Sequence, residues 1–161
     1  MFRIKPSLLL ASFLLAVPGG AFAAPLASSY KSIANITSLG RGDHDCPNGQ
    51  LPVRTSGTGM DLFGYYTLTE ELCADPVTGA FAGRFEIRHS GDGSYCGKFN
   101  GTFLPSGQML EVHAAWRITD GTGAFSDAVG AGTAKGVATL ANGGPGPGTI
   151  VLDGSILVPS H

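Results

Sequence analysis

Glu70 and His89 are the residues whose types and spacing come closest to acid–base chemistry. Strict alternation along a strand places Glu70 on the face that carries Tyr66, and His89 on the face that carries Phe85. If both faces line one apolar interior, burial raises the pKa of the carboxyl group, which is a usual arrangement for proton transfer. Polar residues near strand ends more commonly reach solvent at the rim, and the sequence favours this second interpretation.

A metal-like composition occurs in the segment Asp43-His44-Asp45-Cys46. Adjacent residues of an extended loop point in different directions, so they rarely bind one ion together. The chain has no H-x-H pair and no C-x-x-C pair that would support a zinc or copper centre. We therefore predict an exposed polar loop at this place, and we expect no metal and no cofactor.

The glycine corner Gly121-Thr122-Gly123 is rich in glycine, as phosphate-binding loops are. It lacks the third glycine at the Rossmann spacing and the Lys-Ser/Thr pair of a P-loop, so it predicts a structural corner between two strands. The chain also has no nucleophile elbow, no Ser-His-Asp order and no closely spaced pair of catalytic carboxylates. These absences favour a protein that is not an enzyme.

The first 23 residues read as a secretory signal peptide. Arg3 and Lys5 precede an apolar run over residues 8–17, and Ala21-Phe22-Ala23 is an A-x-A cleavage site. The apolar run is too short for a retained membrane span. The sequence therefore predicts cleavage after Ala23 and a secreted or periplasmic protein with no membrane span.

The charge of the mature chain excludes two classes of partner. Removing 23 of the 161 residues leaves 138, which is enough for one domain with a hydrophobic core. The formal net charge moves from −2 to −4, because two cations and no acidic residue are lost. A mildly acidic chain lacks the overall basic charge that binds nucleic acid or anionic membranes. We expect neither partner.

Short alternating segments separated by glycine favour an all-β fold. The clearest alternation covers residues 80–89, with Phe81, Phe85 and Ile87 on one face and Arg84 and Glu86 on the other. Further strands are predicted over residues 51–57, 62–72, 95–103, 110–118, 130–140 and 149–158. A weak strand over residues 30–37 lies in an N-terminal arm and loop (24–49), and residues 142–148 form a connector with no packed role.

These segments predict one antiparallel β-barrel of about eight strands over residues 50–161. Nearly all the predicted strands are joined by short loops, so an up-and-down meander is the simplest topology. Closing the meander removes the exposed sheet edges, which would otherwise pair with other chains. A homo-oligomer is compatible with this arrangement.

The direction of the strands selects one disulfide from three cysteines. If strands 51–57 and 62–72 form a hairpin, Cys46 lies just before the first strand and Cys73 just after the second, at the same end of the sheet. Cys96 lies early in a strand that starts at the opposite end, which is too far away for disulfide geometry. We therefore predict a Cys46–Cys73 disulfide, which fits an exported protein, and a free thiol at Cys96.

Residues 116–132 follow the pattern W-x-I-x-x-G-T-G-x-F-x-x-A-x-G-x-G. This pattern resembles small exported bacterial proteins related to the barrel domain of allene oxide cyclases and dirigent proteins, and segments 57–64 and 75–83 are similar to the same group. The resemblance covers about residues 50–157 and implies an antiparallel barrel of about eight strands. The matching positions are glycines and core aromatic residues, so no catalytic residue is implied. At Asp61 and Asp120 the chain departs from the group, where His and Gly are common.

Together these observations favour an exported, non-enzymatic barrel that binds a small apolar ligand in its interior. The residues expected to line such a pocket are Tyr66, Glu70, Phe85, His89 and Trp116. Two alternatives stay open. One is an isomerase or cyclase that acts on an apolar substrate, as the resemblance to allene oxide cyclases implies. The other is a solid barrel, filled by its own side chains, with a structural or surface-interaction role.

Overall fold

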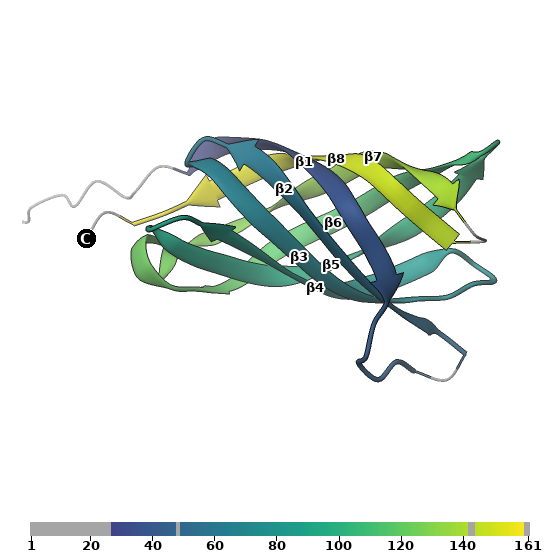
Figure 1. Ribbon diagram of the computed structural model, residues 1–161. Helices are drawn as coiled ribbons and strands as arrows, with labels where there is room; N and C mark the ends of the chain where they lie inside the picture. The colour runs from purple at the N-terminus through teal and green to yellow at the C-terminus, as the bar shows by residue number, and fades with distance from the viewer. Residues whose placement is uncertain (1–26, 48, 142–143, 160–161) are drawn as a thin grey trace, which may run out of the picture.

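Eight antiparallel strands pair in chain order, and the last strand pairs with the first to close a barrel (Figure 1). The computed structural model describes residues 27–47, 49–141 and 144–159. The elements are β1 (Ser28–Arg41), β2 (Leu51–Asp61), β3 (Gly64–Ala74), β4 (Ala80–His89), β5 (Gly93–Ser106), β6 (Met109–Gly121), a short 3-10 helix η1 (Gly123–Phe125), β7 (Val129–Ala141) and β8 (Gly144–Leu157). The all-β fold class and the antiparallel barrel of about eight strands are confirmed.

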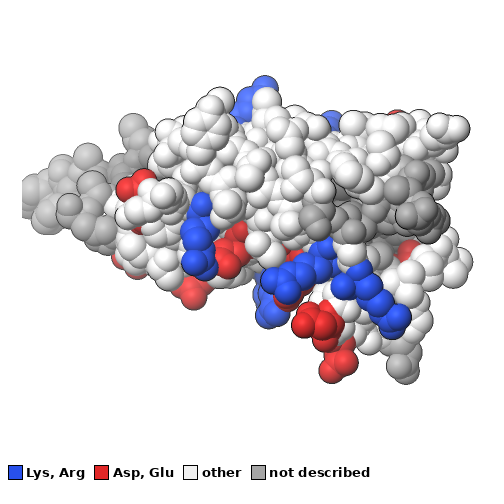
Figure 2. Space-filling model, viewed as in Figure 1, with Lys and Arg blue, Asp and Glu red and all other residues white. Residues whose placement is uncertain are grey.

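Alternating hydrophobicity explains why the strands curl around one core. On β4 the side chains of Phe81, Phe85 and Ile87 are buried, whereas Arg84 and Arg88 are exposed. The face of the barrel in Figure 2 carries charged side chains, as the outward positions of such strands require. Period-two patterning therefore separates an apolar interior from a charged outer wall.

The barrel begins before the boundary expected at residue 50. Most of the predicted N-terminal arm is the strand β1, which pairs with β2 on one side and β8 on the other. Its inward residues include Tyr30, Ala34 and Ile36, but also Ser32. Because small and polar residues occupy several inward positions, the apolar signal of this strand is weak, although the strand closes the barrel.

Two other boundaries also differ from the sequence prediction. The strand predicted over residues 62–72 starts at Gly64, and Leu62 belongs to a tight turn with half of its surface exposed. Of the predicted connector 142–148, residues 142 and 143 lie outside the described part, and the rest starts β8. Gly148 pairs with Ala138 of β7 there, so this segment has a packed role.

Aromatic side chains in the interior lie opposite glycines on neighbouring strands. Phe85 of β4 pairs with Gly97 of β5, and Trp116 of β6 pairs with Gly132 of β7. A Cβ atom at Gly97 would lie 2.6 Å from the Phe85 ring, and one at Gly132 would lie 2.8 Å from the Trp116 ring. The glycines therefore provide the space into which the rings pack.

The two ends of the barrel differ. We call the end that holds Phe63 and Phe125 the plugged end, and the opposite end, where β1 finishes and β2 begins, the cavity end. Ser28 of β1 pairs with Ile156 of β8, so the first and last strands start and finish at the plugged end (Figure 1). The disulfide lies at the cavity end.

Cys46 and Cys73 form the predicted disulfide, with their Cα atoms 5.6 Å apart. It fastens the loop between β1 and β2 to the end of β3, and this chemistry is typical of oxidising compartments. Cys96 is free, as predicted, and burial raises the pKa of its thiol. In the described residues no helix is long and apolar enough to cross a membrane. The predicted signal peptide lies outside these residues.

We expect Gly97→Ala to destabilise the barrel by roughly 2 kcal/mol or more, a typical cost of overpacking. The new Cβ would lie 2.1 Å from the carbonyl oxygen of Arg117, a backbone atom that cannot move away freely. Gly40→Ala is the matched control, because no heavy atom lies within 4 Å of a Cβ there. Urea denaturation measures both, and equal midpoints for the two variants would contradict the packing argument.

Candidate functional site

The barrel interior holds two separate groups of polar side chains. The first lies at the plugged end and consists of Asp61, His89 and the tyrosines around them. The second lies in the other half of the barrel, where Glu70 of β3 and Thr55 of β2 face each other across the strand pair. Apolar side chains separate the two groups, so each has its own chemistry.

Asp61 is the acceptor at the centre of the first group, although its side chain has no exposed surface. The backbone N–H of Phe63 donates to Oδ1 at 2.8 Å. The hydroxyls of Tyr30 and Tyr95 each lie 3.1 Å from Oδ2, and they lie 2.7 Å from one another. One carboxylate therefore joins the start of β1, the turn between β2 and β3, and the start of β5.

His89 lies beside this carboxylate within an aromatic cage. Its ring stacks on Phe125 with centroids 5.0 Å apart and meets the edge of Phe63 at 5.9 Å. Nε2 is 3.5 Å from Oδ2 of Asp61, and neither ring nitrogen has a hydrogen-bond partner in the structure. The side chain is almost completely buried, so the interpretation that His89 reaches solvent at the rim is wrong.

The tyrosines of this group remain protonated over the physiological range. Burial is the main cause that raises the pKa of Tyr66 to about 12, and burial also raises the pKa values of Tyr30 and Tyr95. The Tyr66 hydroxyl shares a hydrogen bond with Ser32 of β1. These phenols act as hydrogen-bonding groups that hold β1, β3 and β5 together, and Phe63 and Phe125 exclude water above them.

Glu70 is the polar residue of the second group. Thr55 Oγ1 donates to Oε2 of Glu70 at 2.6 Å. Burial raises the pKa of the Glu70 carboxyl group, and the bond from Thr55 opposes this only in part. Glu70 is enclosed by the barrel yet keeps some accessible surface, which is what a side chain that lines a hollow does. The sequence favoured the interpretation that Glu70 reaches solvent at the rim of the barrel, and this interpretation is wrong.

The hollow is a cavity of about 60 Å³ in the half of the barrel away from the plugged end. Five aromatic residues, Glu70 and Thr55 line it together with aliphatic residues and glycines; the aromatic residues are Phe81, Phe85, Phe99, Phe103 and Trp116. Trp116 Nε1 donates to the backbone oxygen of Thr133, so its polar edge is already satisfied. Among the described residues that line the cavity, Glu70 therefore offers the one carboxyl group in an apolar wall.

The structure separates the residues that the sequence grouped in one pocket. Glu70, Phe85 and Trp116 line the cavity, whereas Tyr66 and His89 belong to the plugged end. Glu70 pairs with Phe85 and Tyr66 with His89, so the two levels are four positions of β3 apart, which is about 13 Å. The proposed acid–base pair of Glu70 and His89 is therefore not formed.

Sequence reasoning missed Asp61, Tyr30 and Tyr95. Asp61 comes directly before a two-residue turn, where an aspartate commonly accepts a bond from the backbone two residues on, as its bond from Phe63 shows. Tyr95 of β5 is the cross-strand partner of Ile87, which alternation on β4 places on the apolar face. This pairing would have identified Tyr95 as inward. Alternation along β2, on which Thr55, Gly57 and Gly59 are buried, places Asp61 on the inner face as well.

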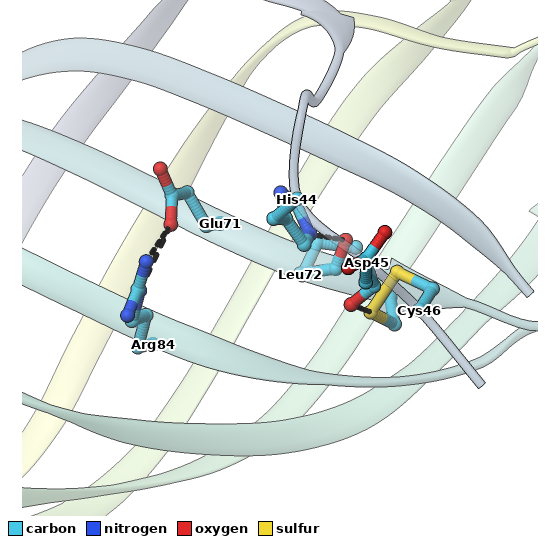
Figure 3. The surroundings of a disulfide bond; sticks show 7 residues. His44, Asp45, Cys46, Glu71, Leu72 and Arg84 are labelled. Atoms are coloured by element: carbon cyan, nitrogen blue, oxygen red, sulfur yellow. Dashed lines mark hydrogen bonds and ion pairs between the residues drawn. A yellow bond between two sulfur atoms is a disulfide. The ribbon is translucent and has the colours of Figure 1, made fainter.

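The loop that carries His44 is held by the barrel wall. His44 Nε2 lies 3.1 Å from the backbone oxygen of Leu72, and Cys46 is fixed in the disulfide (Figure 3). Asp43, His44 and Glu71 can each bring one ligand atom within 4.8 Å of the others. The Glu71 carboxylate already accepts a hydrogen bond from Arg84 at 2.8 Å, and the sulfur atoms of Cys46 and Cys73 are bonded to each other. These possible ligand atoms therefore already have partners within the protein.

Comparison of the chain with protein-family models, with curated proteins and with solved structures finds no match. The resemblance to the barrels of allene oxide cyclases and dirigent proteins therefore stays a prediction.

We expect Asp61→Ala to reduce the free energy of unfolding by about 3 kcal/mol or more, since buried donors that lose a charged acceptor cost about 1 to 3 kcal/mol each. Asp153→Ala, at an exposed position of β8, is the control and should change it by less than about 0.5 kcal/mol. Thermal and urea unfolding measure both values. A small effect at Asp61 would show that the buried group contributes little to closing this end.

We expect Glu70→Gln to stabilise the protein at pH 7 but not below about pH 4, near the pKa of an unfolded glutamate. The folded pKa is raised, so as the pH rises the unfolded chain loses its proton first and the folded state loses stability. Each pKa unit by which the folded value exceeds the unfolded value corresponds to about 1.4 kcal/mol of stability. Unfolding measured from pH 3.5 to 8, with Glu111→Gln as the exposed control, tests this. A gain that is independent of pH would contradict it.

Proposed function

We propose that this chain is an exported β-barrel protein that binds a small apolar ligand in its cavity and does not catalyse a reaction. The observation that carries the proposal is the composition of the cavity wall, in which, over the described part of the chain, aromatic and aliphatic side chains surround a single carboxyl group. Pockets for small molecules commonly combine an apolar lining with a few fixed polar groups. The disulfide and the predicted signal peptide support export to a secreted or periplasmic location.

The size of the cavity limits the ligand. At about 60 Å³ it is smaller than the engineered cavity of roughly 150 Å³ that takes up benzene. Phe81 and Phe103 contact each other with ring centroids 4.4 Å apart, and both line the cavity. Because these rings already contact each other, even a slender alkyl chain enters only if they rotate apart, and a fused ring system requires a still larger opening of the wall.

Glu70 defines the polar part of the ligand. Its carboxyl group accepts a hydrogen bond from Thr55, and burial raises its pKa, which favours the neutral acid more than in an exposed glutamate. A neutral acid donates a hydrogen bond to a hydroxyl or carbonyl oxygen. The preferred ligand is therefore an uncharged aliphatic molecule with one oxygen, such as a long-chain alcohol.

The isomerase or cyclase alternative is weaker because the cavity offers little chemistry. In the described part of the chain Glu70 is the one titratable residue of the lining, and His89 lies at the plugged end. Catalysis would depend on holding a reactive conformer, with a single acid. Recovery of an isomerised product would favour this alternative, and a ligand recovered unchanged favours binding.

Trp116, the single tryptophan of the chain, reports on the cavity that it lines. We expect 1-decanol to shift or quench its fluorescence in a saturable manner. Ala114→Leu, which fills the cavity, should weaken the binding at least tenfold. Ala115→Leu, at the next and outward position of β6, should leave it unchanged.

Circular dichroism confirms that both variants fold before the titrations are compared. Native mass spectrometry of protein purified from its exporting host shows whether an apolar molecule co-purifies. No fluorescence response to decanol and no bound molecule in the mass spectrum would reject the proposal and favour the solid barrel.

A further inference from the structure

The outer wall carries a row of cations that the interior does not explain. Successive cross-strand partners are Arg54 of β2, Glu71 of β3, Arg84 of β4, Lys98 of β5 and Arg117 of β6. We call Arg54, Arg84, Lys98 and Arg117 the cationic row. It contains four of the eight Lys and Arg residues that follow the predicted signal peptide, in a mature chain of net charge −4. Overall composition therefore does not account for the row.

The charges of this row are only partly compensated within the protein. Arg84 forms an ion pair with Glu71 but keeps 74% of its side chain exposed. Within the described ranges no carboxylate forms an ion pair with Arg54, Lys98 or Arg117, and all three are exposed. Like charges directly opposite each other destabilise a sheet. A row with Arg84, Lys98 and Arg117 side by side therefore has a cost that an anionic ligand would remove.

The surroundings of the row define the shape of that ligand. Two residues from the row toward the cavity end, β4, β5 and β6 carry the small, uncharged residues Ala82, Asn100 and Ala115, which are cross-strand partners. They lie in a shallow depression of about 510 Å³ that Lys98 and Arg117 also line. A second depression, of about 500 Å³, is lined by Arg54, Arg84 and Lys98. The row therefore runs between two separate shallow depressions on the wall, and Glu71 and Glu86 also line the second of them.

Acidic residues border the row on its other side. Glu86 and Asp120 lie toward the plugged end, and both pair with Cys96 between them. Figure 2 shows Lys and Arg side chains grouped on one face of the barrel, with Asp and Glu side chains among them. These carboxylates would repel a broad anionic surface such as a membrane. They leave room for a single anionic chain along the row.

We propose that the cationic row binds a linear anionic polysaccharide, which lies across β2 to β6. Five strands at the usual spacing cover about 19 Å, which suits a short stretch of one chain. Arg pairs bidentately with carboxylate and sulfate groups, and Lys adds a point charge. Single-stranded nucleic acid is disfavoured, because neither the row nor its two flanking rows carry an aromatic side chain on which bases could stack. The choice of an extracellular polymer rests on the proposed export.

The test uses a fluorescein-labelled heparin fragment and fluorescence anisotropy. We expect wild-type protein to bind heparin at about 50 mM salt, with affinity that falls steeply by about 200 mM, as polyelectrolyte binding does. The double variant Lys98→Gln/Arg117→Gln should bind at least tenfold more weakly. The control Lys31→Gln/Lys135→Gln, which removes two exposed cations on β1 and β7, should bind as the wild type does. Neutral dextran should not compete.

Three results would overturn the proposal. Equal weakening in both double variants would mean that heparin responds to overall charge. No binding at low salt would remove the site. Tighter binding of a single-stranded oligonucleotide or of anionic vesicles through the same residues would assign the row to another partner. The decanol titration, followed by Trp116 fluorescence, is repeated on the Lys98→Gln/Arg117→Gln variant. It shows whether the cavity proposal holds when the polysaccharide proposal fails, since the two sites lie on opposite sides of the barrel wall.

Discussion

The interior of this barrel depends on one steric constraint: Tyr66, Phe85 and Trp116 each need a neighbouring residue without a Cβ atom. Phe85 occupies the space over Gly97, and Trp116 the space over Gly132 and Gly154, where an added Cβ would lie within 2.9 Å of the ring. With rings in these places, eight strands can close tightly and leave only a narrow hollow. The glycines therefore make room for the rings inside the barrel, and others with positive φ form its turns.

The positions of the polar groups follow from that packing. At the plugged end the rings of Phe63 and Phe125 exclude water, so the carboxylate of Asp61 must be satisfied by donors from the protein, and two tyrosines and a backbone N–H supply them. In the other half the rings do not meet fully, and Glu70 faces the hollow with one partner. The same residue types thus hold the barrel closed at one end and line a hollow at the other.

The fold was largely predictable from the sequence, whereas the site was predictable only in part. Alternation on β4 and the direction of successive strands were sufficient for the barrel and for the Cys46–Cys73 pair. The strand β1 was predicted only as a weak strand outside the barrel, because Ser32 and Ala34 give its inner face little hydrophobic signal. The group around Asp61 was not predicted because it joins residues from five strands. The placement of such residues depends on register, which a turn of two residues shifts.

The pairing of Ser28 with Ile156 brings the beginning and the end of the barrel to the same rim, the plugged one. A fusion partner or surface tether joined at either of these strands would approach the molecule from that side. The cavity end and the loop held by the disulfide would then point away from the attachment. The protein is thus suited to immobilisation through its termini with its cavity half left accessible, and to circular permutation across the adjacent β1 and β8.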